Sequence, residues 1–248
     1  MGAPTVNVEG TLDQDDPYVA APPSSRRRGV LADEVAGYVR QLILTGSLRP
    51  GTKIDQDAVG RALDVSRSPI REALVVLGHE GLLDLTPRRG ASVAQLRRED
   101  IIDHYELFGV VSGRAAAMAA ELLDEDQIRE LNELHSRFTG DDQEVLQQLN
   151  HDFHRVINLA APRRTRWLLR HLERTVPANY YEFADGWNHR AVEHHASILE
   201  AITRRDPEGA RSAMEGHLHE SGVAAADQLE ERGFFTDPDT GGPAEAGQ

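Results

Sequence analysis

Residues 64–74, DVSRSPIREAL, decide the fold of the N-terminal part of this chain. Ser66 is a favourable N-cap whose hydroxyl can accept a backbone N–H, and Pro69 suits the first turn of a helix. The apolar residues that follow at helical spacing, which predict one buried face, are Ile70, Ala73, Leu74 and Leu77. Hydroxyls and arginines remain on the other face or at the helix tip, where they suit phosphates and guanine edges. The stretch therefore predicts a helix that reads DNA.

The neighbouring segments complete a winged helix-turn-helix. Asp55 can cap a short helix that ends just before Asp64, and two short helices joined by a tight turn are typical of this motif. Gly81 ends the second helix, and residues 82–85 and 91–94 then read as strands joined by a basic turn. Upstream, the apolar residues between 31 and 43 predict an amphipathic helix that ends near Gly46.

The order of these motifs resembles the DNA-binding domain of GntR-family transcription regulators. The resemblance covers about residues 28–96 and rests on ILTGSLRPG at 43–51, VSRSPIREAL at 65–74, EGL at 80–82 and RG at 89–90. It implies that DNA-contacting positions are matched by Arg67, Ser68, Arg71, Arg89 and Gly90. Ser66 joins them through its place at the helix tip. Asp57 departs from the pattern, because some members carry a basic residue there, near the DNA.

Charge is distributed unevenly along the 248 residues, whose net charge is −14. Residues 1–25 carry −4, residues 26–98 carry +5 and residues 99–248 carry −15. The positive charge is thus concentrated in the predicted DNA-binding domain, as phosphate binding requires. The acidic remainder would repel DNA and so help to keep the basic domain at the contact face.

Composition limits the class of protein. The chain has no cysteine, which excludes disulfides and thiolate metal sites. It shows no apolar run long enough to span a membrane and no signal-peptide pattern, so we expect a cytoplasmic protein. We expect a disordered arm at 1–25, a winged helix-turn-helix at 26–96, a helical domain at 97–231 and a flexible tail at 232–248.

The second domain is predicted to be an all-helical bundle, which makes the fold mainly α. Its first helix is long and runs from about 101 to 122, with Gly109 and Gly113 small enough to let another helix pack closely. Shorter helices are expected at 124–138, 143–160, 164–182, 188–204 and 207–230. Asp124 and Asp206 are the expected N-caps, and Pro207 suits a first helical position.

Three of these helices each carry a histidine on the face predicted to be buried. His154 shares a face with Asn150, His195 lies on an inward stripe while His194 falls to its side, and His217 also points inward. Three imidazoles and an oxygen donor form a site for zinc or another divalent transition metal such as nickel. The sequence alone does not show that the three converge, so ordinary buried core histidines are the alternative.

The same residues resemble the FCD ligand domain of the FadR-type subgroup of GntR regulators. The resemblance rests on residues 150–154, 193–202 and 210–217, and metal-binding members place histidines at the positions of His154, His195 and His217. They commonly carry an aspartate where this chain has Asn150, so the site would lose one negative charge. The subgroup's effector-binding arginine often follows a Tyr-Glu-Leu run, where this chain has Phe108. An organic acid is the effector class that the subgroup implies, and the candidate contacts are Tyr105, Arg170, Asn179 and Tyr180.

The sequence therefore predicts a ligand-responsive transcription regulator rather than an enzyme. We expect a homodimer on a pseudo-palindromic operator, acting as a repressor, with a metal and a small-molecule effector in the helical domain. One alternative is a metal-dependent enzyme with an accessory DNA-binding domain, although the chain lacks a His-Glu-x-x-His run and a clear general base beside the histidines. The other is a regulator whose metal is purely structural.

Overall fold

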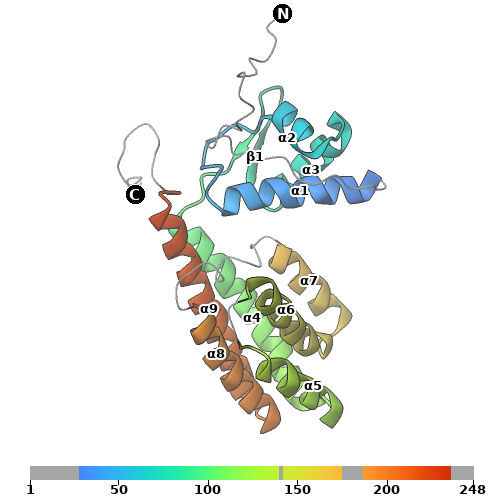
Figure 1. The fold of residues 1–248 in the computed structure, drawn as a ribbon, viewed down its shortest axis with the longest axis vertical. Coiled ribbons are helices and arrows are strands. Elements are labelled where there is room, and N and C mark those ends of the chain that lie inside the picture. The colour runs from blue at the N-terminus through green and yellow to red at the C-terminus, as the bar shows by residue number, and fades with distance from the viewer. Residues whose placement is uncertain (1–27, 140–141, 175–186, 236–248) are drawn as a thin grey trace, which may run out of the picture. The chain divides into compact units, whose positions relative to one another are not determined.

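The computed structural model describes residues 28–139, 142–174 and 187–235 (Figure 1). These residues divide into two compact units, with the boundary between Ala94 and Gln95 and with residues 44–46 grouped in the second unit. The predicted N-terminal arm and residues 236–248 of the predicted tail lie outside the described residues.

The first unit is a winged helix-turn-helix. Its helices are α1 (Arg28–Leu44), α2 (Gln56–Leu63) and α3 (Arg67–His79). Strands β1 (Leu83–Thr86) and β2 (Gly90–Val93) pair antiparallel, with Leu83 opposite Val93. The predicted elements are all present, although each strand is shifted by one residue from its expected range.

The turn between α2 and α3 is built by local side-chain and backbone preferences. Asp55 caps α2 by accepting hydrogen bonds from the backbone N–H groups of Asp57 and Ala58, as predicted. Asp64 ends α2 in the left-handed conformation, with φ of 53°. Ser66 is the N-cap residue of α3, but the prediction that its hydroxyl caps the helix is wrong. The donor that such a cap most often uses is the third helical N–H, and here that residue is Pro69, which has none.

A mostly buried ion pair joins α1 to the end of α3. The guanidinium of Arg40 donates to both carboxylate oxygens of Glu80, over distances of 2.6 to 3.1 Å. Each side chain is only 12% exposed. The pair therefore fixes how α1 meets the last turn of α3.

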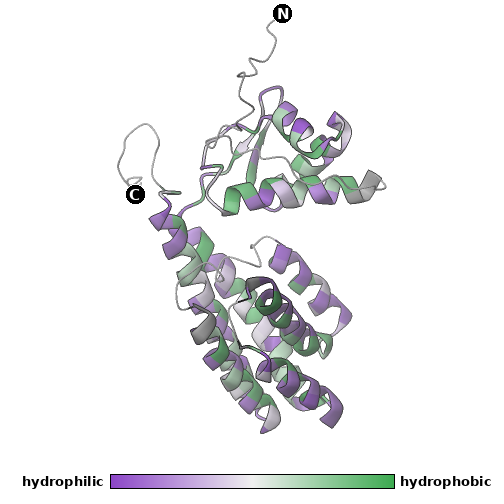
Figure 2. Ribbon diagram, viewed as in Figure 1, coloured by the Kyte–Doolittle hydropathy of each residue, from purple (hydrophilic) through white to green (hydrophobic). Residues whose placement is uncertain are grey.

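The second unit is a helical bundle. Its helices are α4 (Arg98–Leu122), α5 (Glu125–Ser136), α6 (Gln143–Leu159), α7 (Arg163–Arg174), α8 (Trp187–Thr203) and α9 (Pro207–Glu231). Each carries both hydrophobic and hydrophilic residues along its length (Figure 2). The expected bundle is confirmed, and the part of the expected helix 164–182 beyond Arg174 lies outside the described residues.

Helices α4 and α9 run antiparallel and pack closely along each other. Small residues make this possible, as predicted: a Cβ added at Gly113 would lie 3.1 Å from the carbonyl oxygen of Arg211, and one at Gly109 would lie 3.4 Å from that of Glu215. Near the other end of the pair, the side chain of Tyr105 fills the space beside Gly222.

The ends of the bundle helices are satisfied by side chains. Asp124 and Asp206 accept backbone hydrogen bonds at the starts of α5 and α9, which confirms both predicted N-caps. Arg205 donates to the carbonyl oxygens of Ala120 and Leu123 and so satisfies the end of α4. Beyond α9, residues 232–235 form a turn with Phe234 fully buried, so this part of the predicted tail is packed rather than loose.

Among the described helices, we find none whose length and hydropathy would allow it to cross a lipid bilayer.

Candidate functional site

The predicted DNA-reading helix presents two distinct faces. Arg67, Ser68 and Arg71 are exposed, and so is Ser66 at its tip. The apolar side, which is buried in the unit, comprises Pro69, Ile70, Ala73, Leu74 and Leu77. The structure thus places all four predicted polar residues of α3 and its cap on the surface, where DNA can reach them.

Two carboxylates also lie on this surface. Asp57 of α2 pairs with Arg67, with 3.1 Å between a carboxylate oxygen and a guanidinium nitrogen, and the two side chains are 63% and 72% exposed. The hydroxyl of Ser68 donates to Glu72 at 3.3 Å. The positive charge of Arg67 is therefore partly neutralised by an acidic residue of the chain itself.

The wing ends in a tight basic turn. Arg88 has φ of 66° and Gly90 has φ of 96°, so the turn uses two residues in a conformation that favours glycine. Arg88 and Arg89 are both exposed. Gly90 shapes the turn that presents these two arginines, and of them only Arg89 was singled out from the sequence.

The three predicted histidines of the second unit converge. His154 of α6, His195 of α8 and His217 of α9 each offer a ring nitrogen, and these nitrogens lie within 4.8 Å of one another. The ring centroids are 5.2 Å apart for His154 and His195, 5.2 Å for His154 and His217, and 4.9 Å for His195 and His217. Sequence spacing placed each histidine on an inward face, and the packing of the three helices brings them together.

Aromatic rings hold His195 in place. Its imidazole stacks on Phe153 at 4.5 Å between centroids, and Phe138 meets it edge-on at 5.0 Å. The side chain is fully buried, yet neither ring nitrogen has a hydrogen-bond partner among the described residues. Leaving a buried polar group unpartnered costs about 1–3 kcal/mol, so this arrangement points to a bound ligand.

Burial keeps these histidines uncharged. It lowers the pKa of His154 to about 4, and it lowers the pKa of His195 and His217 well below the usual 6.5. The neighbouring imidazoles act in the same direction, because each disfavours a positive charge on the others. Neutral imidazoles are the form that binds metals.

The cluster fits a divalent transition metal. A zinc–nitrogen bond is about 2.1 Å, which puts tetrahedral ligand nitrogens about 3.4 Å apart, so nitrogens that lie within 4.8 Å of one another must move closer to share one ion. Asn150 is half-buried on α6, one turn before His154, and its predicted part in the site stays a prediction.

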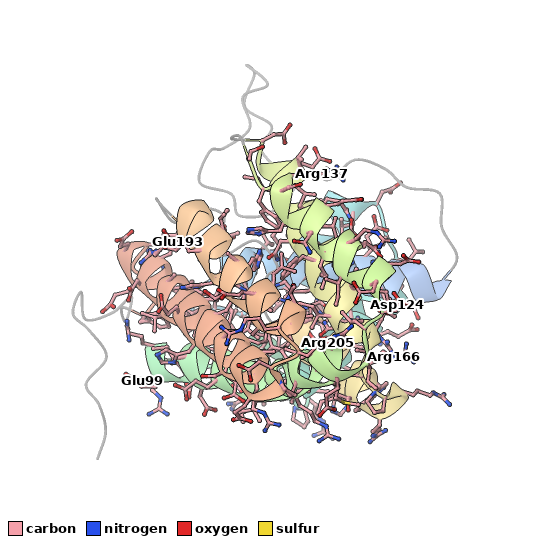
Figure 3. The ribbon with its side chains drawn as sticks, turned by 90° about the horizontal axis from the view of Figure 1, so that it is seen from below. Glu99, Asp124, Arg137, Arg166, Glu193 and Arg205 are labelled. Atoms are coloured by element: carbon pink, nitrogen blue, oxygen red, sulfur yellow. The ribbon has the colours of Figure 1, made fainter. Side chains whose placement is uncertain are left out.

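Two further histidines lie beside the cluster. The Nδ1 atom of His194 is 3.5 Å from the Nδ1 atom of His217, although the sequence suggested only that His194 falls to the side of the inward stripe. His194 does lie to the side of the inward stripe of α8, and α9 packs against that side. Figure 3 labels its exposed neighbour, Glu193. His135 of α5 is half-buried, and a positive charge on it would lower the pKa of His195.

The structure describes two of the four predicted effector contacts, and their part in effector binding stays a prediction. Tyr105 is 2% exposed in the interior of the bundle, whereas Arg170 is exposed on α7. Asn179 and Tyr180 lie outside the described residues. Phe108, at the position where the subgroup often has a carboxylate-binding arginine, packs against the small apolar cluster of Ala115, Ala161 and Leu169.

Comparison with protein families gives two matches, one in each unit. Residues 31–93 match the family described as bacterial regulatory proteins, gntR family. Residues 103–220 match the FCD domain. The first match covers the helix-turn-helix and the wing, and the second covers the three converging histidines.

Individual proteins agree with this division. An uncharacterised HTH-type transcriptional regulator of Mycobacterium tuberculosis is 29% identical over 187 residues, which cover 74% of this chain and 76% of the relative. The HTH-type transcriptional repressor RspR of Escherichia coli is 26% identical over 75% of this chain and 85% of its own. The solved structure of E. coli McbR, 22% identical, matches the fold with a TM-score of 0.60 over 81% of this chain and 98% of its own.

Proposed function

The chain belongs to the GntR family of bacterial regulatory proteins, with an FCD domain, and we propose that a divalent metal and a small-molecule effector in that domain control its binding to DNA. That the chain is a DNA-binding transcriptional regulator follows from its family. The observation that supports the metal is the buried imidazole of His195, whose two nitrogens have no partner within the described part of the chain.

His154, His195 and His217 would hold the metal through one nitrogen each, with the side-chain oxygen of Asn150 as a further donor. Zinc is the proposed ion and nickel the second choice, because three neutral imidazoles suit both. When bound, the metal would supply a Lewis acid that can polarise an oxygen of the effector. The proposed effector is an organic acid.

On DNA, the proposed form is a homodimer in the cytoplasm. One recognition helix contacts few base pairs, and a symmetric dimer doubles the contacts on a pseudo-palindromic operator. Two large apolar side chains on α4 support self-association: Leu107 is 53% exposed and Val110 is 59% exposed. We propose repression that the effector relieves, in line with RspR, which is named a repressor. Contacts with DNA are assigned to Ser66, Arg67, Ser68, Arg71 and the wing at Arg89 and Gly90.

The test combines metal analysis with DNA binding. Purified protein should contain one equivalent of metal per chain, and His195→Ala should lose it, whereas His219→Ala, which removes an exposed histidine of α9, should keep it. A footprint on the DNA upstream of the protein's own gene should respond to candidate organic acids only when metal is present. Wild-type protein without metal, after purification in its presence, would overturn the metal site.

A structural metal is the second candidate, favoured by the aromatic rings that enclose His195. In that case chelation would lower the melting temperature, but no organic acid would alter the spectrum of a cobalt-substituted site. Conversion of a bound acid to product would instead show an enzyme.

A further inference from the structure

We propose that His194 and Glu220 determine which nitrogen of His217 binds the metal. This inference rests on the proposed metal site and concerns residues outside the three candidate ligands. His194 precedes His195 on α8, and Glu220 follows His217 by three residues on α9, so the two lie where α8 packs against α9.

The geometry forms a chain of three polar groups. Nε2 of His194 is 3.6 Å from a carboxylate oxygen of Glu220, and Nδ1 of His194 is 3.5 Å from Nδ1 of His217. The side chain of Glu220 is 53% exposed, that of His194 is 24% exposed, and His217 is buried. The three groups thus lead from the surface to the histidine cluster.

The chemistry of these three groups indicates which nitrogen of each histidine carries the proton. The carboxylate of Glu220 lies just beyond direct hydrogen-bond distance, but its negative charge favours the tautomer of His194 that carries the proton on the facing Nε2 atom. The Nδ1 atom of a neutral His194 is then an acceptor, and the contact with His217 requires the proton to lie on Nδ1 of His217. In that tautomer, the lone pair of His217 is on Nε2, which becomes the metal-binding nitrogen.

The carboxylate of Glu220 also adds negative charge beside the site. The four candidate donors, Asn150 and the three histidines, are all neutral, so the metal's charge would be uncompensated by its own ligands. An outer carboxylate that accepts a hydrogen bond from an imidazole makes the next group a better donor, and such partners typically change metal affinity 10- to 100-fold. Glu220 would act in this way through His194.

The chain contains a matched control on the same helix. His219 of α9 pairs with Glu106 at 3.0 Å, and both of these side chains are about half exposed. Two residues beyond His217 on a helix, His219 points to a different side from the cluster. His219→Ala therefore removes a histidine–carboxylate pair without touching the site.

Metal affinity gives the first readout. We would measure zinc dissociation constants at pH 7.5 by competition with a chromogenic chelator, using the full chain. His194→Ala should weaken binding about 10-fold or more, Glu220→Gln should weaken it less, and His219→Ala should change it less than 2-fold. Equal affinities for His194→Ala and His219→Ala would overturn the inference while leaving the metal site in place.

The tautomer of His217 gives a readout that a structural role would not change. Nitrogen-15 shifts of the metal-free protein should show the proton of His217 on Nδ1, and His194→Ala should mix the two tautomers. His194→Asn, which keeps an acceptor near the same position, should restore the Nδ1–H form. A wild-type His217 protonated on Nε2 would contradict the inference even if zinc failed to bind, so the two proposals can fail separately.

Discussion

The guanidinium of Arg67, at the first position of the recognition helix, lies 3.1 Å from the carboxylate of Asp57 on the preceding helix. An ion pair as exposed as this one contributes about 0–1 kcal/mol to stability. Its greater effect is electrostatic, because Asp57 places a negative charge on the face where DNA phosphates would approach. We therefore expect Asp57 to lower the affinity of the protein for DNA.

Replacing Asp57 by asparagine should tighten binding to DNA of any sequence. One lost repulsion and one released arginine should raise affinity by about 10-fold at low salt, and the gain should shrink as salt increases. Fluorescence anisotropy at two salt concentrations measures this. Asp103→Asn, which removes an exposed carboxylate from α4, is the control and should have a smaller effect. Unchanged or weaker binding by Asp57→Asn would contradict the prediction.

Arg71→Ala should separate base reading from phosphate binding. If Arg71 contacts a guanine edge with both nitrogens, specific binding should weaken by about 1–3 kcal/mol while non-specific binding changes little. Titration of operator and scrambled duplexes gives both values. Equal losses on the two duplexes would assign Arg71 to phosphate, and Arg129→Ala on the exposed face of α5 should alter neither.

Arg40→Ala should destabilise the winged unit by about 3 kcal/mol, because it leaves the buried carboxylate of Glu80 without its partner. Urea unfolding followed by circular dichroism measures the change. The exposed pair of Arg155 and Glu130 provides the comparison, and Arg155→Ala should cost less than about 1 kcal/mol. Similar losses of stability in the two variants would mean that burial does not determine how much the Arg40–Glu80 pair contributes to the free energy of unfolding.

The metal-free protein should lose stability as the pH falls below about 6.5. The folded-state pKa of His154 is lowered to about 4, and those of His195 and His217 are lowered well below 6.5, so between pH 6.5 and 4 the unfolded chain binds more protons. Stability is therefore fully present above pH 6.5 and declines by up to about 1.4 kcal/mol per pH unit for each histidine.

Urea unfolding at pH 7.5, 6.0 and 5.0, with a chelator present, measures this dependence. His195→Leu should have a shallower slope, because it removes one of the titrating groups. Zinc should make the wild-type slope steeper, since protons compete with the metal for the same nitrogens. A slope that His195→Leu leaves unchanged would assign the pH dependence to carboxylates elsewhere.

Local patterns in the sequence predicted much of this molecule. Helical spacing placed Ile70 and Leu74 on a buried face and Arg67 on the surface, and capping rules located Asp55, Asp124 and Asp206. The absent hydrogen bond from Ser66 could also have been found, since Pro69 occupies the position of its usual donor. These features depend on residues within a few positions of one another.

Contacts between helices were harder to predict. The inward faces of His154, His195 and His217 followed from spacing, but their convergence depends on how three helices pack. His194 was assigned to the flank of its helix, and no local rule showed that α9 covers that flank. The pairing of Asp57 with Arg67 is likewise set by the angle between two helices, which spacing along the chain does not determine.

The close fit of α4 and α9 has a mechanical consequence. Gly109 and Gly113 let the two backbones touch, and Arg98, the first residue of α4, forms ion pairs with Asp227 and Glu230 near the end of α9. Two helices that contact each other at several points along their length bend little, so α4 and α9 are expected to move as one body. A displacement of His217 on α9 is therefore expected to move Arg98 as well, at the residue where α4 begins.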